Sequence, residues 1–129
     1  MADPTIDETR DGARVVVYGD SAPVTEQEWH CARLLHALHG DSLVIEPHED
    51  GGWCATPWAH RGTRERAVDE LQWVLEDDAK RRVRDAASIA ASSRRAAEKH
   101  ARAAAENSDA ASVAEAGAAR LRALLAGAP

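Results

Sequence analysis

The sequence predicts an α+β fold: a small β-α-β-β head, a long helix, and a final antiparallel helix that completes a helical hairpin. Three observations lead to this prediction. Residues 63–106 contain neither glycine nor proline, so one helix can run through them. Residues 13–60 alternate short β-branched runs with a single amphipathic stretch. After about residue 85, alanine supplies most of the apolar side chains, which favours helix.

The composition bounds the class of protein. A chain of 129 residues has the size of one domain, with only four Trp, one Tyr and no Phe to build a core. Residues 1–20 lack the apolar segment of a signal peptide, and no run approaches the roughly 20 apolar residues of a membrane span. We therefore expect a cytoplasmic protein that does not contact a membrane.

The formal net charge of −6 is unevenly distributed along the chain. Residues 1–60 hold eleven acids and three arginines, whereas residues 79–105 hold eight bases and two acids. Such charges are commonly the solvated faces of an ordinary protein. The basic stretch is nevertheless suited to an anionic partner.

The head is expected at residues 13–78. It follows an acidic leader, residues 1–12, that shows no periodicity and is expected to be disordered. A β-branched run at residues 14–18 predicts the first strand. A capping box from Thr25 to Glu28 then begins an amphipathic helix, which ends at Gly40 because glycine readily adopts the left-handed conformation of a helix end.

Two more strands are predicted at residues 42–46 and 53–55, on either side of the turn signal Asp50-Gly51-Gly52. A strand–helix–strand unit makes a right-handed crossover between parallel strands, and the hairpin adds an antiparallel neighbour. Residues 58–62 are expected to form a loop. Thr63 is then the N-cap of the long helix.

The apolar stripe of the long helix changes near Ala79 from large to small side chains. We expect its first part to cover the second face of the head's sheet, through Val68, Leu71, Val74 and Leu75. From Ala79 onward the stripe holds alanines and Ile89, and small side chains permit close approach of another helix.

The arm is expected at residues 79–129. The polar residues 107–109 are expected to break the long helix, and a last helix at about residues 110–126 is expected to fold back as its antiparallel partner. Its apolar positions recur at spacings of three and four: Val113, Gly117, Leu121 and Leu124.

A hairpin of two alanine-rich helices buries little apolar area, so it would be only marginally stable alone. We therefore expect the arm to bind a second copy of the chain or another protein. The functional prediction is a non-enzymatic interaction or oligomerisation module, in a regulator, adaptor or accessory protein.

Seven side chains are candidates for partner contact: Trp58, Trp73, Arg81, Arg84, Arg95, Lys99 and Arg102. The two tryptophans are good anchors if they are exposed. The five bases cluster on the side of the long helix opposite its apolar stripe, and their line of charge suits phosphates. The alternative function is therefore nucleic-acid association through residues 79–105. No aromatic residue lies among these bases to stack on nucleobases, and no reader motif is evident.

Histidine and cysteine are dense in the first sixty residues: His30, Cys31, His36, His39, His48, Cys54 and His60. No Cys-x-x-Cys or His-Glu-x-x-His motif is present. We interpret the cysteines, paired or free, as small core residues and most of the histidines as exposed. A nucleophile formed by Cys54 with His48 or His60 is an alternative, but the sequence marks no oxyanion site and no orienting group. The sequence thus predicts no catalytic residue, no cofactor and no metal ligand.

Overall fold

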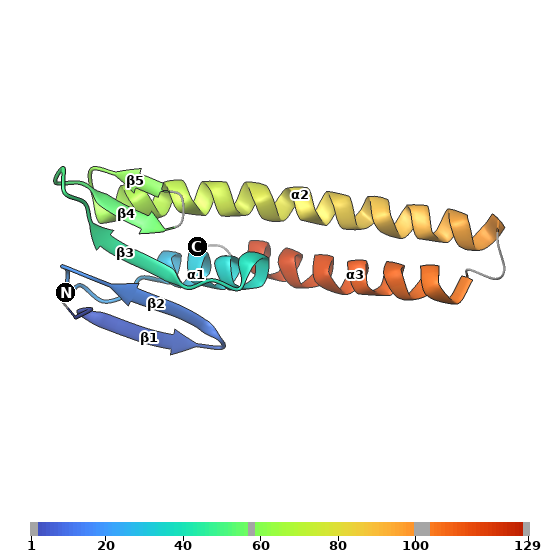
Figure 1. Ribbon diagram of the computed structural model, residues 1–129, viewed down its shortest axis with the longest axis horizontal. Helices are drawn as coiled ribbons and strands as arrows, with labels where there is room; N and C mark the ends of the chain where they lie inside the picture. The colour runs from blue at the N-terminus through green and yellow to red at the C-terminus, as the bar shows by residue number, and fades with distance from the viewer. Residues whose placement is uncertain (1–2, 57–58, 100–103, 128–129) are drawn as a thin grey trace. The chain divides into compact units, whose positions relative to one another are not determined.

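The computed structural model describes residues 3–56, 59–99 and 104–127. Contacts divide the chain into two compact units, with the boundary between Asp77 and Asp78, inside one helix. The unit up to Asp77 is the head, and Asp78–Ala126 is the arm. The α+β fold class is confirmed (Figure 1). The elements in chain order are β1 (Ile6–Arg10), β2 (Ala13–Val17), α1 (Glu26–His39), β3 (Leu43–Pro47), β4 (Trp53–Thr56), β5 (Ala59–Arg61), α2 (Arg64–Lys99) and α3 (Ala104–Ala126).

The head contains a five-stranded sheet whose spatial order follows the chain, β1-β2-β3-β4-β5. The predicted crossover is confirmed: β2 and β3 are parallel, with Val16 opposite Val44, and α1 connects them. The predicted hairpin is also confirmed, because β4 pairs antiparallel with β3.

The prediction of a disordered leader at residues 1–12 is wrong. β1 lies in this segment and pairs antiparallel with β2, from Ile6 opposite Val17 to Arg10 opposite Ala13. Asp11 and Gly12 form the turn between them with φ values of 52° and 85°. Two successive positive φ angles are what a two-residue hairpin turn requires, and Asp-Gly supplies them.

The loop predicted at residues 58–62 is also partly wrong. Ala59–Arg61 forms β5, which pairs antiparallel with β4 at the edge of the sheet. A three-residue edge strand leaves too short a hydrophobic pattern to be recognised from sequence.

The predicted helix ends in the head are confirmed. The Thr25 hydroxyl accepts from the Glu28 N–H at 3.1 Å, and Glu28 accepts from the Thr25 N–H at 2.9 Å, which completes the capping box. Gly40 ends α1 with a φ of 67°. The Thr63 hydroxyl accepts from the Arg66 N–H at 3.1 Å and so caps the start of α2.

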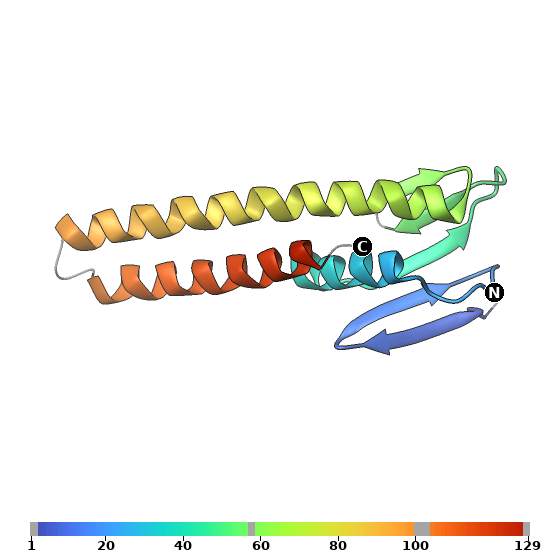
Figure 2. The ribbon, with the colours of Figure 1, turned by 180° about the vertical axis from the view of Figure 1, so that it is seen from behind.

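Both helices of the head pack on one face of the sheet. The strand residues that point to this face are fully buried, among them Val15, Val17, Leu43 and Ile45. α1 and α2 contact each other directly, because the Cys31 thiol lies 3.9 Å from the Val68 carbonyl oxygen. The sheet lies in front of the two helices in Figure 1 and behind them in Figure 2.

The expectation that the long helix covers the second face is therefore wrong, although Val68, Leu71 and Leu75 are buried as predicted. α2 instead packs beside α1, on the face that α1 already covers. The other sheet face, here called the open face, bears no helix of the head over the described residues. Strand register places Arg14, Glu46, Cys54 and His60 on it.

The break between the two long helices differs from the prediction. α2 ends at Lys99, and α3 already begins at Ala104, so residues 107–109 are helical. Polar and acidic residues are well tolerated near a helix N-terminus, where they complement unpaired N–H groups and the helix dipole. Over the described residues, no helix combines the length and apolar character needed to cross a membrane.

Candidate functional site

The structure leaves most of the predicted contact residues at the surface. Trp73 is 71 % exposed on α2, on the side away from Leu71 and Leu75 as predicted. Arg81, Arg84 and Arg95 are exposed on the same helix. Trp58, the side chain of Lys99, and Arg102 lie outside the described residues.

The seam between α2 and α3 in the arm is built from small side chains. Its buried residues are Ala79 and Ala90 from α2 and Ala111, Ala118 and Leu121 from α3. Alanine buries little area, so the seam gains less from the hydrophobic effect than a leucine-rich one would. An ion pair between Arg94 and Glu115 joins the two helices beside it.

Three residues expected to share the apolar face of the hairpin lie outside the seam. Ile89 is 50 % exposed, Val113 is 74 % exposed, and Gly117 is exposed. Successive helical residues turn by about 100°, so Ile89 points about 100° away from Ala90. By the same reckoning, Val113 and Gly117 point about 140° and 100° away from Ala118.

These displaced residues point to one side of the hairpin. Each of these residues is rotated from the seam in the same direction about the axis of its own helix. Because the two helices are antiparallel, the same direction of rotation points to the same side of the hairpin. Leu124, which is partly exposed, lies on this side too. We call Ile89, Val113, Gly117 and Leu124 the apolar flank of the arm. A Cβ atom added at Gly117 would meet no atom within 4 Å, so the flank is open there.

The opposite side of the hairpin is basic. Arg84 and Arg95 are eleven residues apart and therefore nearly aligned on α2, while Arg122 lies on the same side of α3. We call these three residues the basic flank. A hollow of about 310 Å³ between α2 and α3 is lined by four alanines and by Arg94, Glu115 and Arg122. The alanine seam thus leaves space that no side chain of the arm fills.

The two units have opposite charge. Residues 1–77 carry sixteen acids and six bases, whereas residues 78–126 carry ten bases and six acids. Net charges of −10 and +4 follow, so the basic stretch seen in the sequence coincides with the arm.

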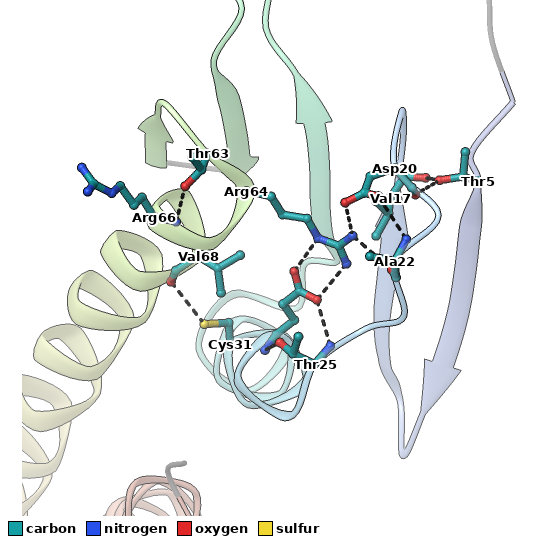
Figure 3. Close-up of polar contacts among 11 residues, drawn as sticks. Thr5, Val17, Asp20, Ala22, Thr25, Cys31, Thr63, Arg64, Arg66 and Val68 are labelled. Carbon is teal, nitrogen blue, oxygen red and sulfur yellow. Dashed lines mark hydrogen bonds and ion pairs between the residues drawn. The ribbon is translucent and has the colours of Figure 1, made fainter.

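A hollow of about 480 Å³ in the head lies beside a partly buried ionic network, whose residues are drawn in Figure 3. Arg64 donates to both carboxylate oxygens of Glu28 at 2.8 and 2.9 Å, to Asp20 at 2.9 Å, and to the Ala22 carbonyl at 3.1 Å. These bonds engage four of the five N–H donors of the guanidinium. The network therefore ties α2 to the start of α1, and it has little donor capacity left for an anionic ligand.

The open face of the sheet brings together the three residues that the sequence offered as an alternative nucleophile, Cys54 with His48 or His60. Ligand atoms of His48, Cys54 and His60 all lie within 4.8 Å of one another. The two histidines are exposed as predicted, and Cys54 is partly exposed, not buried in the core. Their imidazole rings have centroids 4.5 Å apart. The β4–β5 pairing, which was not predicted, places His60 directly opposite Cys54.

An aspartate orients this cluster. Asp50 accepts from the Gly52 backbone N–H at 2.9 Å and lies 3.1 Å from His48 Nδ1 and 3.3 Å from His60 Nε2. The Gly52 hydrogen bond, followed by the two imidazoles, holds the pKa of Asp50 below its usual range. The carboxylate is therefore ionised near neutral pH.

The two cysteines are free and differ in environment. Burial, followed by the nearby Glu76, Glu28 and Asp69 carboxylates, raises the pKa of the Cys31 thiol to about 12. A thiol with so high a pKa is inert at neutral pH, so Cys31 is a core residue as predicted.

Comparisons of the chain with protein-family models, with curated proteins and with solved structures find no match. The arm and the open face of the sheet are therefore the two regions that indicate a function.

Proposed function

We propose that the protein is a non-enzymatic interaction module that self-associates through the apolar flank of its arm. The observation that carries the proposal is the position of Ile89 and Val113. They are two of the three large hydrophobic residues exposed among the described residues, and both lie on one side of one hairpin. Exposed apolar residues gathered on one surface mark interaction sites, whereas scattered ones need no explanation.

The composition of the arm supports the same proposal. Its seam is mostly alanine and leaves a hollow of about 310 Å³, so the hairpin is weakly stabilised by its own contacts. Packing two hairpins flank to flank would bury Ile89, Val113 and Leu124 and form a four-helix bundle. The two basic flanks would then face outward, away from each other.

Gly117 also fits this arrangement. Glycine inside a helix costs about 1 kcal/mol relative to alanine, and the described structure shows no contact that requires it. A helix from a second copy could approach closely at this position. In a two-fold symmetric dimer, each Gly117 would serve the same purpose for its partner.

The test is the mass of the protein in solution. The monomer is 13.9 kDa, and we expect a larger, concentration-dependent mass by light scattering or sedimentation equilibrium. Replacing Ile89 and Val113 together by lysine should return the protein to the monomer, because two charges would be buried at the interface.

A matched control uses the preceding residue in each helix. Ser88 and Ser112 are exposed and point away from the apolar flank, so Ser88→Lys with Ser112→Lys adds the same charge elsewhere. This control should keep the wild-type mass. A wild-type monomer at high concentration would rule out self-association. In that case the apolar flank would bind a different protein. That protein should co-purify with the Ser88→Lys, Ser112→Lys control and be lost from the Ile89→Lys, Val113→Lys variant.

A second candidate function is nucleic-acid association through the basic flank, favoured by the exposure and alignment of Arg84 and Arg95. Phosphate contacts release counterions, so such binding would weaken steeply with salt. Arg84→Glu with Arg95→Glu should abolish it, while the lysine variant of the apolar flank should retain it. Absence of DNA or RNA binding by the wild-type protein at low salt would end this proposal.

A further inference from the structure

The cluster on the open face brings together three side chains that can bind a metal. His48, Cys54 and His60 offer two imidazoles and one thiol, with ligand atoms within 4.8 Å of one another. Two imidazoles and a thiolate are a typical ligand set for zinc and for other borderline or soft transition metals. The same set is poorly suited to Mg²⁺ or Ca²⁺, which prefer oxygen ligands.

Strand register fixes two of the three donors. Cys54 in β4 is directly opposite His60 in β5, so both side chains point from the same face of the sheet. On its other side, Cys54 is opposite Glu46 in β3. His48 follows Glu46 by two residues and therefore returns to the same face.

The turn between β3 and β4 fixes the third donor. The His48 N–H donates to the Gly52 carbonyl at 2.7 Å, and the Gly51 N–H donates to the His48 carbonyl at 3.0 Å. Gly51 has a φ of 88°, which favours glycine at this position. The backbone around His48 is thus held on both sides.

Gly52 preserves the room that the cluster occupies. A Cβ atom at this position would lie 2.9 Å from His60 Nε2 and 3.1 Å from Asp50 Oδ1, and it would also collide with the Arg61 carbonyl oxygen at 2.9 Å. Any other residue here would displace His60 or Asp50. The glycine is therefore tied to the placement of the cluster as well as to the turn.

Asp50 has the position of an outer partner to the two histidines. Its Oδ1 lies 3.1 Å from His48 Nδ1 and 3.3 Å from His60 Nε2, so the site proposed below uses His48 Nε2 and His60 Nδ1 as the metal ligands. A carboxylate on the far nitrogen fixes the orientation of a metal-binding imidazole and strengthens it as a ligand.

We propose that His48, Cys54 and His60 bind one zinc-like divalent transition-metal ion, with water at a remaining position. Cys54 binds as the thiolate and releases its proton to solvent when the metal–sulfur bond forms. A tetrahedral site needs ligand atoms about 3.3–3.6 Å apart, so the side chains close around the ion by rotation. The site is independent of the arm and of its association.

Cobalt(II) provides the test, because it occupies zinc sites and reports its ligands by absorption. We use the full-length chain without an affinity tag, stripped by chelator and kept reduced. We expect one Co²⁺ bound per chain, with a thiolate-to-cobalt charge-transfer band that zinc removes by displacement. Zinc should also raise the melting temperature of the head, because it binds only the folded form.

Variants decide which residues hold the ion. Cys54→Ser should abolish the charge-transfer band, and His48→Gln or His60→Gln should weaken Co²⁺ binding more than tenfold. His39→Gln removes an exposed histidine outside the cluster, so it should leave the charge-transfer band and the affinity for Co²⁺ unchanged. Circular dichroism of each variant establishes that the fold is retained.

Three results would overturn the proposal. They are a wild-type protein that shows no charge-transfer band, a band that persists in Cys54→Ser, and cobalt binding that is indifferent to both His48→Gln and His60→Gln. These measurements do not depend on the mass of the protein. Their outcome is therefore independent of whether the protein self-associates.

Discussion

The head and the arm are stabilised in different ways, although one helix runs through both. The head buries large side chains completely, among them Trp29, Leu34, Leu35 and Leu71. The arm buries alanines and a single leucine among its described residues. Burial of a leucine contributes about 1.5–3 kcal/mol, whereas an alanine side chain adds only one carbon.

The ion pairs of the two units show the same difference, because the pair in the head is more deeply buried than the pair in the arm. In the head, Glu28 is almost fully buried, with a side chain that is 4 % exposed, and it is held by Arg64. In the arm, the Arg94–Glu115 pair is 61 % and 53 % exposed, so solvent screens it. The head therefore specifies its own structure, and the arm depends more on helix propensity and on whatever covers its apolar flank.

Two optical probes can separate the units. All four tryptophans lie within residues 1–77, so their fluorescence reports on the head. Most helical residues lie beyond Asp77, in the second part of α2 and in α3, so circular dichroism is weighted toward the arm. We expect the two urea transitions not to coincide, with the circular dichroism signal lost first.

The largest effect is expected from Leu35→Ala. Leu35 is fully buried in the head, so its truncation should lower the free energy of unfolding by about 4 kcal/mol. The fluorescence transition in urea measures this loss. Leu121→Ala, in the seam of the arm, should shift the circular dichroism transition and leave the fluorescence midpoint in place. If both substitutions shift the fluorescence equally, the two units unfold as one.

Arg64→Met should have the next largest effect. The substitution leaves the Glu28 carboxylate buried without its cation, which should lower the free energy of unfolding by about 3 kcal/mol. This loss is at the lower end of the usual range because solvent reaches Arg64 from the adjoining hollow. The corresponding arm variant, Arg94→Met, should cost at most about 1 kcal/mol. Equal losses would mean that the buried network has no special importance in the head.

Gly117→Ala separates stability from association. In dilute, monomeric protein, the alanine should stabilise α3 by about 1 kcal/mol, measured by thermal unfolding in circular dichroism. At high concentration the added methyl group should weaken self-association, because it occupies the apolar flank. Ala116→Gly, at the exposed neighbouring position, should destabilise by a similar amount and leave the dissociation constant unchanged. Stronger association in Gly117→Ala would argue against close approach at this glycine.

The smallest effect concerns His30, which is 3 % exposed in α1. Burial lowers the pKa of His30, Glu76 opposes this shift, and Arg33 adds to it. The folded head thus binds this proton less readily than the unfolded chain, whose histidine pKa is about 6.5. Stability should therefore be complete above pH ~6.5 and decline as the pH falls below it.

Replacing His30 by leucine should flatten the decline between pH 7 and pH 5, measured by the fluorescence midpoint in urea. His39→Gln, at the exposed end of α1, should keep the wild-type slope. If His30→Leu loses as much stability as the wild type between pH 7 and pH 5, protonation of His30 is not the cause of the decline.

Local sequence signals predicted much of the head. The caps at Thr25, Gly40 and Thr63 were all identified, because each depends on a few neighbouring residues. β1 escaped detection because its residues 7–10 are polar and exposed, and their strand character comes from pairing with β2. The Asp11-Gly12 pair was the available signal for that hairpin.

The candidate sites were less predictable, since both depend on how elements meet. Cys54 and His60 become neighbours only once β4 and β5 are in register. On α3, a spacing of three and four residues could not decide between Val113, which is exposed, and Ala118, which is buried in the seam. Only the packed hairpin distinguishes the two sides of such a helix.

The continuity of α2 across the boundary at Asp77 has a consequence for the order of folding. Starting a helix is unfavourable because several residues must be fixed before the first hydrogen bond forms, whereas extending one is easy. The head fixes the first turns of α2 by burying Ala67, Val68 and Leu71. It also leaves the ribosome first. The newly made chain beyond Asp78 can therefore elongate a helix that already exists, and a segment that would nucleate poorly alone begins with its first turns in place.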